Sequence, residues 1–255
     1  MNMRAVGRFG LCIVFAMAAR AASSATFSVD PASDAFVTTG PSGNLSNNNY
    51  GGAGALAVAA PGLSQGEFQS LLQFNMSGAK SSFDTQFGAG QWMIQSVTLQ
   101  LTAASPNNAI FNASSAGQFG LSWIQNNGWT EGTGTPSAPT TTGITFATLN
   151  NFLSSTDEAL GIFSFNGATS GSASYALNLT PSFSADILSG GAISLRMFGA
   201  DNSISYTLDS RNFGTVSARP LLTIAATAIP EPGRLSLAVI GCLVAFWRYG
   251  WLRGR

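Results

Sequence analysis

The stretch Ile94-Gln95-Ser96-Val97-Thr98-Leu99-Gln100-Leu101 decides the fold class of this 255-residue chain. Its apolar side chains at positions 97, 99 and 101 alternate with polar ones at 98 and 100, the two-residue period of a strand with one buried face. The same alternation recurs from Phe119 to Trp123, from Tyr175 to Leu179 and from Ile193 to Met197. The sequence therefore predicts an all-β protein.

Shorter apolar stretches bounded by Gly, Asn, Ser and Pro add further strand candidates at 35–38, 56–58, 70–75, 144–146, 161–165, 204–208 and 221–224. Many short strands with turn residues between them favour an antiparallel β-sandwich, best described as jelly-roll-like. One short helix is expected after Thr180, because Pro181 suits a first helical turn and Gly190 a stop. Proline and glycine make residues 132–143 a loop.

The N-terminus has the pattern of a secretory signal peptide, which we assign to residues 1–25. Arg4 and Arg8 precede an apolar stretch over residues 9–19, and small residues follow at 21–25. Cleavage is expected after Ala22 or Ala25. Because both cysteines lie in the apolar end segments, at 12 and 242, the body over residues 26–228 can form no internal disulfide.

The C-terminus, residues 229–255, combines Pro230-Glu231-Pro232 with an apolar run over residues 235–247 and arginines at 248, 253 and 255. The run is shorter than the roughly 20 residues that cross a bilayer core, although Arg248 can extend it by reaching toward the headgroups. The basic tail predicts a single membrane helix with a cytoplasmic C-terminus. The alternative is a buried C-terminal helix of a soluble domain.

This tail resembles the PEP-CTERM sorting signal of Gram-negative bacteria. The resemblance implies processing by an exosortase, with Pro230, Glu231 and Pro232 as the sorting signal. It implies export to the cell surface or extracellular matrix of an exopolysaccharide-producing bacterium, after transient anchoring in the inner membrane.

Charge in the body argues against a nucleic-acid partner. Residues 26–228 contain four basic and ten acidic side chains, a net charge of −6 that is hidden by the formal neutrality of the whole chain. Phosphate binding needs a basic face, which this composition does not supply.

Ordered motifs in the body resemble the DNRLRE domain of bacterial surface proteins. They include Asp34-Ala-Phe-Val, Asn49-Tyr50-Gly51, Trp129-Thr-Glu131-Gly, Leu195-Arg-Met and Asp209-Ser210-Arg211. The resemblance implies a jelly-roll-like sandwich similar to carbohydrate-binding modules, some of which bind acidic polysaccharides. This chain departs from the pattern at Asn212, where the family usually has an acidic residue.

The sequence contains few residues of the types that usually carry out catalysis. The chain has no histidine, the body has no thiol, and Lys80 lacks a Ser-x-x-Lys spacing. We therefore expect a non-catalytic surface or matrix protein associated with exopolysaccharide. The alternative is a polysaccharide-active enzyme, a glycoside hydrolase or lyase, that uses paired carboxylates drawn from Asp34, Glu131, Asp157 and Glu158.

A carbohydrate-binding site is expected around Tyr50, Asn127, Trp129 and Glu131, because sugar recognition combines an exposed ring with a few fixed polar groups. The alternative, which is favoured for Trp129 because large aromatic side chains in sandwiches usually lie in the core, places it at one end of the sandwich, with Glu131 hydrogen-bonded to loop backbone. Trp123 lies on the apolar face of a strand and is expected in the core.

No cofactor is expected, with one exception. Asp30, Asp34, Asp201 and Asp209 are oxygen ligands of the kind that a structural calcium ion prefers, although the chain has no contiguous calcium-binding loop. The alternative is that these carboxylates cap turns.

Overall fold

The computed structural model describes residues 23–230, so the predicted sorting signal from Glu231 onward and the predicted leader up to Ala22 lie outside the described residues. The described chain is mostly β-structure. Its strands are β1 (Ser24–Val29), β2 (Ser33–Thr38), β3 (Ala55–Ala59), β4 (Phe68–Asn75), β5 (Trp92–Thr102), β6 (Gly117–Ile124), β7 (Glu158–Phe165), β8 (Ser172–Leu177), β9 (Ala192–Gly199), β10 (Ser205–Asp209) and β11 (Leu221–Ala228).

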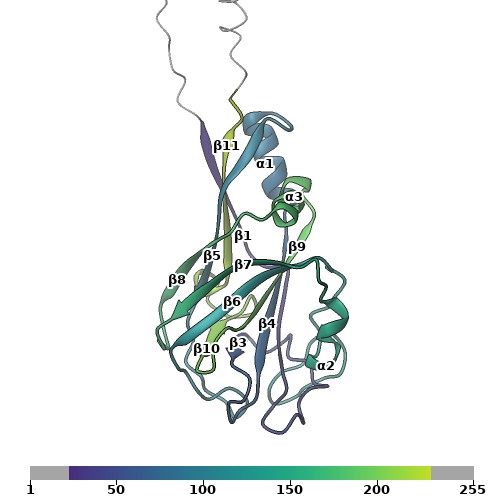
Figure 1. Ribbon diagram of the computed structural model, residues 1–255, viewed down its shortest axis with the longest axis vertical. Coiled ribbons are helices and arrows are strands. Elements are labelled where there is room, and N and C mark those ends of the chain that lie inside the picture. Colours follow the sequence, from purple (N-terminus) through teal and green to yellow (C-terminus); the bar gives the residue numbers. More distant parts are fainter. Residues whose placement is uncertain (1–22, 231–255) are drawn as a thin grey trace, which may run out of the picture.

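The strands form two antiparallel sheets (Figure 1). The smaller sheet has the order β1-β11-β5-β8, and the larger has the order β10-β3-β4-β9-β6-β7 with β2 also paired to β4. The chain crosses between the sheets repeatedly, so most strand neighbours are distant in sequence. The predicted all-β class is confirmed, with a β-sandwich-like arrangement.

The main core lies between the two sheets. Val97, Leu99 and Leu101 of β5 contribute from the smaller sheet, and the inward side chains of β4, β6 and β9 contribute from the larger one. The apolar and polar side chains alternate over residues 94–101 because one face of β5 is buried against the opposite sheet. Trp123 is 3% exposed, as predicted for a core residue.

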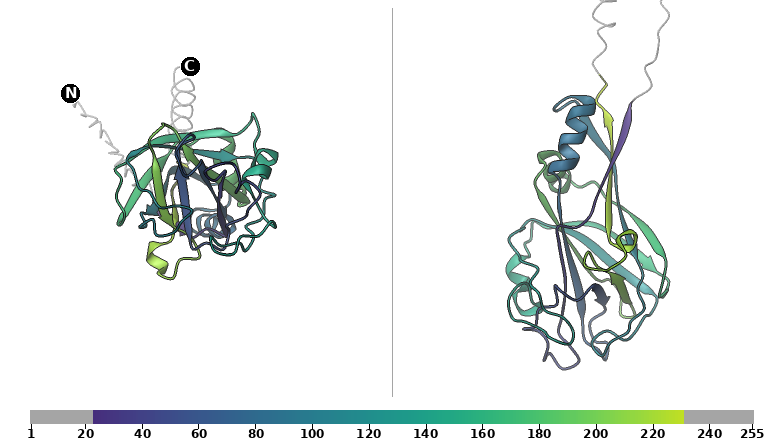
Figure 2. Two further views of the ribbon diagram at one scale, coloured as in Figure 1. Left: turned by 90° about the horizontal axis from the view of Figure 1, so that it is seen from below. Right: turned by 180° about the vertical axis from the view of Figure 1, so that it is seen from behind.

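The molecule is elongated, and both ends of the described chain leave it at the same pole (Figures 1 and 2). We call this part the neck: β1, the helix α1 (Ser77–Phe87), and the paired ends of β5 and β11 over residues 92–97 and 224–228. Phe83 of α1 is fully buried in the neck and contacts the rings of Phe27 and Trp92. The neck thus has its own aromatic packing.

Three α-helices are present in the described residues, so the prediction of one helix was wrong. The missed helix α1 has few apolar side chains, and only Ala79 and Phe83 are buried. Those two, with Phe87, are spaced by four residues, which is a helical signal in an otherwise polar segment. Lys80 and Asp84, also four apart, form an ion pair on its exposed side.

The strand predicted over residues 144–146 was also wrong. Helix α2 (Phe146–Leu149) begins there, and Thr145 caps it by accepting a hydrogen bond from the Thr148 backbone N–H. Thr148 Oγ1 in turn accepts the Thr145 N–H, which completes a capping box. The two β-branched residues Ile144 and Thr145 favoured a strand in this short run. The capping box starts a helix there instead.

The helix predicted after Thr180 is confirmed as α3 (Pro181–Ser189). Pro181 occupies its first turn, and Gly190 ends it with φ +76°, a left-handed conformation suited to glycine. The loop predicted at 132–143 contains no named strand.

Strand β1 was not predicted, because its first residues fall within the segment assigned to the leader. The predicted boundary between residues 25 and 26 therefore lies inside β1. Across residues 23–230 no helix combines the length and apolar character needed to span a bilayer.

Candidate functional site

Several of the motifs singled out from the sequence meet in one polar cluster, which we call the Arg211 cluster: Asp34, Asn49, Glu131, Arg211 and Asn212. Arg211 and Asn212 follow β10, Asp34 lies in β2, and the other two lie in loops. These positions are up to 178 residues apart in the sequence, so only the fold brings them together.

Glu131 and Arg211 form the central ion pair of this cluster. Arg211 Nη2 donates to Glu131 Oε2 at 2.6 Å, and Nε donates to both carboxylate oxygens at 2.9 and 3.0 Å. The Glu131 side chain is 12% exposed and the Arg211 side chain 34% exposed, so the carboxylate is largely shielded from water while the guanidinium is partly open to it. Such a fork geometry fixes the orientation of both side chains.

Asn212 adds hydrogen bonds to the carboxylate side of this ion pair. Its amide Nδ2 donates to Glu131 Oε1 at 2.9 Å and to the Gly51 carbonyl at 3.1 Å. An acidic side chain with the same position would place a like charge against Glu131.

Asn49 connects two loops, the one between β2 and β3 and the one between β6 and α2, and is fully buried. Its Nδ2 donates to the carbonyls of Glu131 and Ile144 at 2.7 and 2.8 Å, and its Oδ1 accepts the N–H groups of Gly51 and Gly134. Residue 51 must be small, since a Cβ there would lie 2.1 Å from the Glu131 carbonyl oxygen. The Asn-Tyr-Gly motif is therefore a structural connection between loops.

Asp34 is the buried carboxylate of the cluster, 1% exposed. Its Oδ2 accepts the Arg211 backbone N–H at 2.7 Å, while its buried Oδ1 has no hydrogen-bond partner among residues 23–230. Burial raises the pKa of Asp34 to about 7, and the neighbouring Glu131 charge adds to this, against the opposing hydrogen bond and charge of Arg211.

The predicted exposed aromatic platform was wrong for both rings. Trp129 is 4% exposed, packs with Val37, Leu71 and Ile124, and donates from Nε1 to Ser194 Oγ at 3.0 Å. Tyr50 is 1% exposed and stacks on Phe36 with a centroid distance of 4.7 Å. The alternative, that Trp129 is a core residue, is confirmed.

Asn127 and Glu131 also make structural contacts. Asn127 Nδ2 donates to the Ala192 carbonyl at 2.9 Å, and the Asn127 backbone carbonyl accepts a hydrogen bond from Gln73 Nε2 at 2.8 Å. The structure thus places Glu131 inside the Arg211 cluster and Tyr50 next to it in the chain, beside Asn49. Asn127 and Trp129 instead pack against the larger sheet.

The other two carboxylates proposed for catalysis, those of Asp157 and Glu158, accept hydrogen bonds from backbone N–H groups. Asp157 accepts the N–H groups of Gln125 and Ser154, at 3.0 and 2.9 Å. Glu158 accepts those of Ser182 and Phe183 at the start of α3, together with the Thr180 hydroxyl. Burial alone would raise the pKa of Glu158, but these hydrogen bonds outweigh it and lower the pKa to about 2.

Asp201, one of the carboxylates considered for calcium, also binds backbone N–H groups. Its Oδ1 accepts the N–H groups of Ser203 and Ile204, and its Oδ2 accepts that of Gln118. It caps a turn, as the alternative predicted. Asp209 is 6% exposed in β10, and burial raises its pKa to about 6. In residues 23–230, three or more potential metal-ligating side chains do not gather at one point.

A row of polar and aromatic side chains that sequence reasoning missed lies on the outer face of the larger sheet. We call it the outer row: Glu67, Gln69, Arg196 and Phe198. Gln69 is buried and the other three are half-buried. Arg196 Nε donates to Gln69 Oε1 at 2.6 Å, and its guanidinium lies 4.7 Å from the centre of the Phe198 ring. Gln69 Nε2 donates to Glu67 Oε1 at 2.5 Å, so the four side chains form a continuous chain of contacts.

The outer row depends on a glycine in the next strand. Gly120 of β6 pairs with Phe198 of β9, and a Cβ on Gly120 would lie 2.5 Å from Phe198 Cζ. The ring therefore lies over the bare backbone of β6. The motif Leu195-Arg-Met was a signal for this surface, because in a strand its central residue points away from the core.

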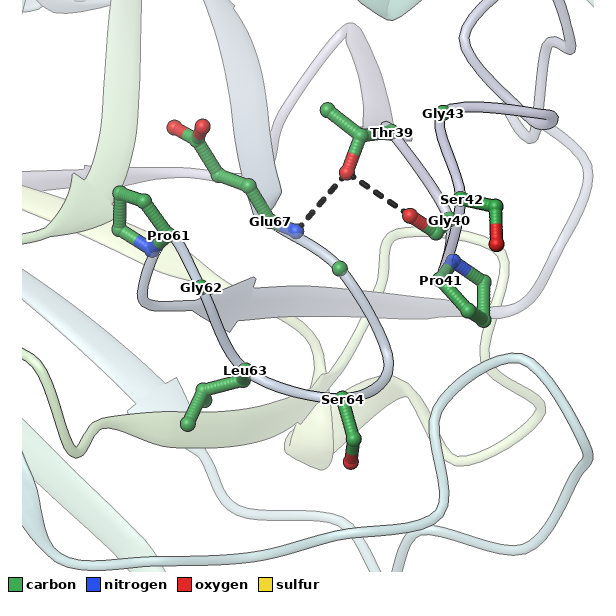
Figure 3. A pocket seen from close by; sticks show the side chains of 11 residues that line it. Thr39, Gly40, Pro41, Ser42, Gly43, Pro61, Gly62, Leu63, Ser64 and Glu67 are labelled. Carbon is green, nitrogen blue, oxygen red and sulfur yellow. Dashed lines mark hydrogen bonds between the residues drawn. The ribbon is translucent and has the colours of Figure 1, made fainter.

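Glu67 also lines a pocket of about 440 Å³ between two turns, residues 39–43 and 61–67 (Figure 3). Thr39 Oγ1 accepts the Glu67 N–H at 3.0 Å and holds the turns together. The lining is mostly Gly, Pro, Ser and Thr, with no aromatic ring. Its Glu67 end adjoins the outer row.

No protein-family model matches the chain, and a search of curated proteins found no relative.

Proposed function

We propose that this chain is an exported, non-catalytic protein of the bacterial cell surface or extracellular matrix, processed by an exosortase at its C-terminal tail. The observation that carries the proposal is the tail itself, in which Pro230-Glu231-Pro232 precedes an apolar segment and terminal arginines. A membrane segment followed by positive charge holds the preceding domain on the outer side of the membrane.

The position of the chain ends supports this proposal. Ile229 N–H donates to the Gln91 carbonyl at 2.9 Å, so the ordered body continues to the residue before the tripeptide. Both ends lie at the tip of the neck (Figures 1 and 2). A body joined to the membrane there would extend its two-sheet part away from the bilayer.

Processing can be tested in a Gram-negative strain with an exosortase and in the same strain lacking it. We expect the body to be released only where the exosortase is present, and to stay in the membrane fraction elsewhere. Replacing Pro230 and Pro232 together by Ala should block release. Replacing the exposed Pro61 and Pro139 together is the matched control and should leave release unchanged. Equal release from both strains would contradict the proposal.

We further propose that the body is a jelly-roll-like sandwich, similar to a DNRLRE domain, and that it contacts exopolysaccharide. The repeated crossing of the chain between two antiparallel sheets supports the first part. Catalysis is not part of the proposal, since Glu131 is paired with Arg211, and Asp157 and Glu158 bind backbone N–H groups.

The outer row is the surface that best fits glycan contact, because it combines a partly exposed ring with fixed polar groups and one cation. Sugar rings bind to such combinations by apolar contact with the ring and hydrogen bonds to the polar groups. The outer row replaces Tyr50 and Trp129 as the proposed site of glycan contact, because the rings of those two residues are buried.

Affinity electrophoresis in gels that contain the exopolysaccharide of the host tests this contact. Replacing Phe198 by Ala should weaken retention by roughly 1 to 3 kcal/mol, the scale for losing an anchor side chain. Phe213, 37% exposed in the loop before β11, is the matched control, and Phe213→Ala should bind normally. Equal retention of both variants would rule out the outer row.

A further inference from the structure

The dipeptide Asn-Gly occurs twice in the chain, at residues 127–128 and 166–167. In this dipeptide the asparagine side chain reacts readily with its own backbone, because glycine has no side chain to shield its nitrogen. The glycine nitrogen attacks the side-chain carbonyl carbon of the asparagine, and ammonia leaves. The sequence alone does not distinguish the two sites, but the fold places them in different surroundings.

Asn166 is exposed and lies directly after β7, in the loop that leads to β8. Its Oδ1 accepts the Ala168 N–H at 3.0 Å, which closes a tight turn between the side chain and the backbone. This turn holds the side-chain carbonyl carbon beside the Gly167 nitrogen. The Ala168 N–H also points at the oxygen on which negative charge develops during attack. Within residues 23–230, the Gly167 N–H donates no hydrogen bond and is therefore available to react.

The second site, Asn127-Gly128, is restrained by hydrogen bonds to both reacting groups. Asn127 Nδ2, the group that would leave, donates to the Ala192 carbonyl at 2.9 Å. The Gly128 N–H, which would have to lose its proton, donates to Asn126 Oδ1 at 2.9 Å. Asn127 Oδ1 is buried and has no donor within residues 23–230 to stabilise developing charge. Attack at this site would therefore break two hydrogen bonds without gaining a stabilising one.

We propose that Asn166 is a site of spontaneous deamidation and that the fold protects Asn127 from the same reaction. A bond forms between the Gly167 nitrogen and Asn166 Cγ, the bond from Cγ to Nδ2 breaks, and Nδ2 leaves as ammonia with the proton from Gly167. Water then opens the five-membered imide at either carbonyl carbon, which leaves aspartate or isoaspartate at position 166. One water is consumed and one ammonia is released, so the reaction needs no enzyme and no oxidant.

The reaction changes both the charge and the backbone of this loop. Each product adds one negative charge to a body with a net charge of −6. Isoaspartate also inserts a methylene group into the backbone just before Ala168, which packs against the main core. The charge change can be followed by isoelectric focusing, and the backbone change by peptide mapping.

Peptide mapping by mass spectrometry tests the proposal on the purified full chain, kept in mildly alkaline buffer either folded or unfolded in guanidinium chloride. In the folded chain Asn166 should convert at least about tenfold faster than Asn127, since breaking even one hydrogen bond is worth roughly that factor. In the unfolded chain the two sites should convert at similar rates, because both are followed by glycine. Equal rates in the folded chain, or an Asn166 that converts only after unfolding, would overturn the proposal.

A matched pair of variants assigns the charge change to this residue. Asn166→Gln lengthens the side chain by one methylene group, so ring closure is slow, and the acidic form that accumulates in the wild type should be lost. Asn202→Gln changes another exposed asparagine, one that is followed by serine, and should leave that acidic form in place. Accumulation of the acidic form at the wild-type rate in Asn166→Gln would contradict the assignment.

Discussion

At the scale of single residues, Trp129 is the clearest case of an aromatic side chain that supports the fold and is unavailable to a ligand. Its ring closes a small core on the outer face of the larger sheet, and its Nε1 donates to Ser194. Trp129→Ala should lower the free energy of unfolding by about 3 to 5 kcal/mol in urea titrations. Trp129→Phe, which keeps most of the volume, should cost clearly less. If both variants match the wild type, Trp129 does not belong to the core.

Asp34 should make the stability of the body depend on pH in an uncommon direction. Its pKa is about 7 in the folded chain against an ordinary value of 3.8, so folding favours the protonated form. The stability from neutral Asp34 is complete below about pH 4 and is lost as pH rises toward 7. Between pH 5 and pH 8 this residue should lower the free energy of unfolding by roughly 2 to 3 kcal/mol.

Urea titrations of the wild type and of Asp34→Asn at several pH values measure this effect. The variant should lose most of the decline between pH 5 and pH 8. Asp30→Asn, an exposed carboxylate changed in the same way, should keep it. An unchanged pH profile in Asp34→Asn would show that Asp34 titrates at an ordinary pKa in the folded chain.

The cluster around Arg211 shows what residue types alone could predict. The sequence singled out Asp34, Glu131 and Arg211 as members of separate motifs, but it did not predict that they are in contact. Arg211 and Glu131 lie 80 residues apart in the sequence, and only the fold brings their side chains together. Tyr50 and Trp129 were misplaced for a related reason. Both lie in Asn- and Gly-rich loops that suggest exposure, yet those loops fold back over the larger sheet.

At the scale of elements, helix α3 depends on a side chain from another strand. Thr180 precedes the helix without capping it, and Glu158 of β7 accepts its first free N–H groups instead. Glu158→Gln should lower the free energy of unfolding by roughly 1 to 2 kcal/mol, the usual scale for losing a helix cap. Asp30→Asn again serves as control. A variant as stable as the wild type would show that α3 needs no cap from β7.

Alternation predicted most of the larger strands well, because each has one face on the core. It failed for α1, where few apolar side chains are needed to contact the neck, and for α2, where a cap outweighs a β-branched pair. It missed β1 because the small residues that suit a leader cleavage site also suit the start of a strand. The local pattern of small residues fits both a leader cleavage site and the start of a strand. Only the pairing of β1 with β11 shows that these residues form a strand.

At the scale of the whole molecule, the body should fold without either end segment, since its core is closed within residues 23–230. Residues 22–229 expressed alone should give a β-rich circular dichroism spectrum and one cooperative melt. Residues 26–225, which lack the paired ends of β1 and β11, should be less stable by roughly 2 kcal/mol or more. Equal melting temperatures for the two segments would show that the tip of the neck adds nothing to the fold.

The central proposal, that the tail is a sorting signal removed during export, is tested most directly by mass spectrometry of the mature protein recovered from the surface of an exosortase-bearing host. We predict peptides that cover the body as far as the region of Pro230 to Gly233, and none from Leu235 to Arg255. Recovery of an intact C-terminus at Arg255 from surface material would contradict it.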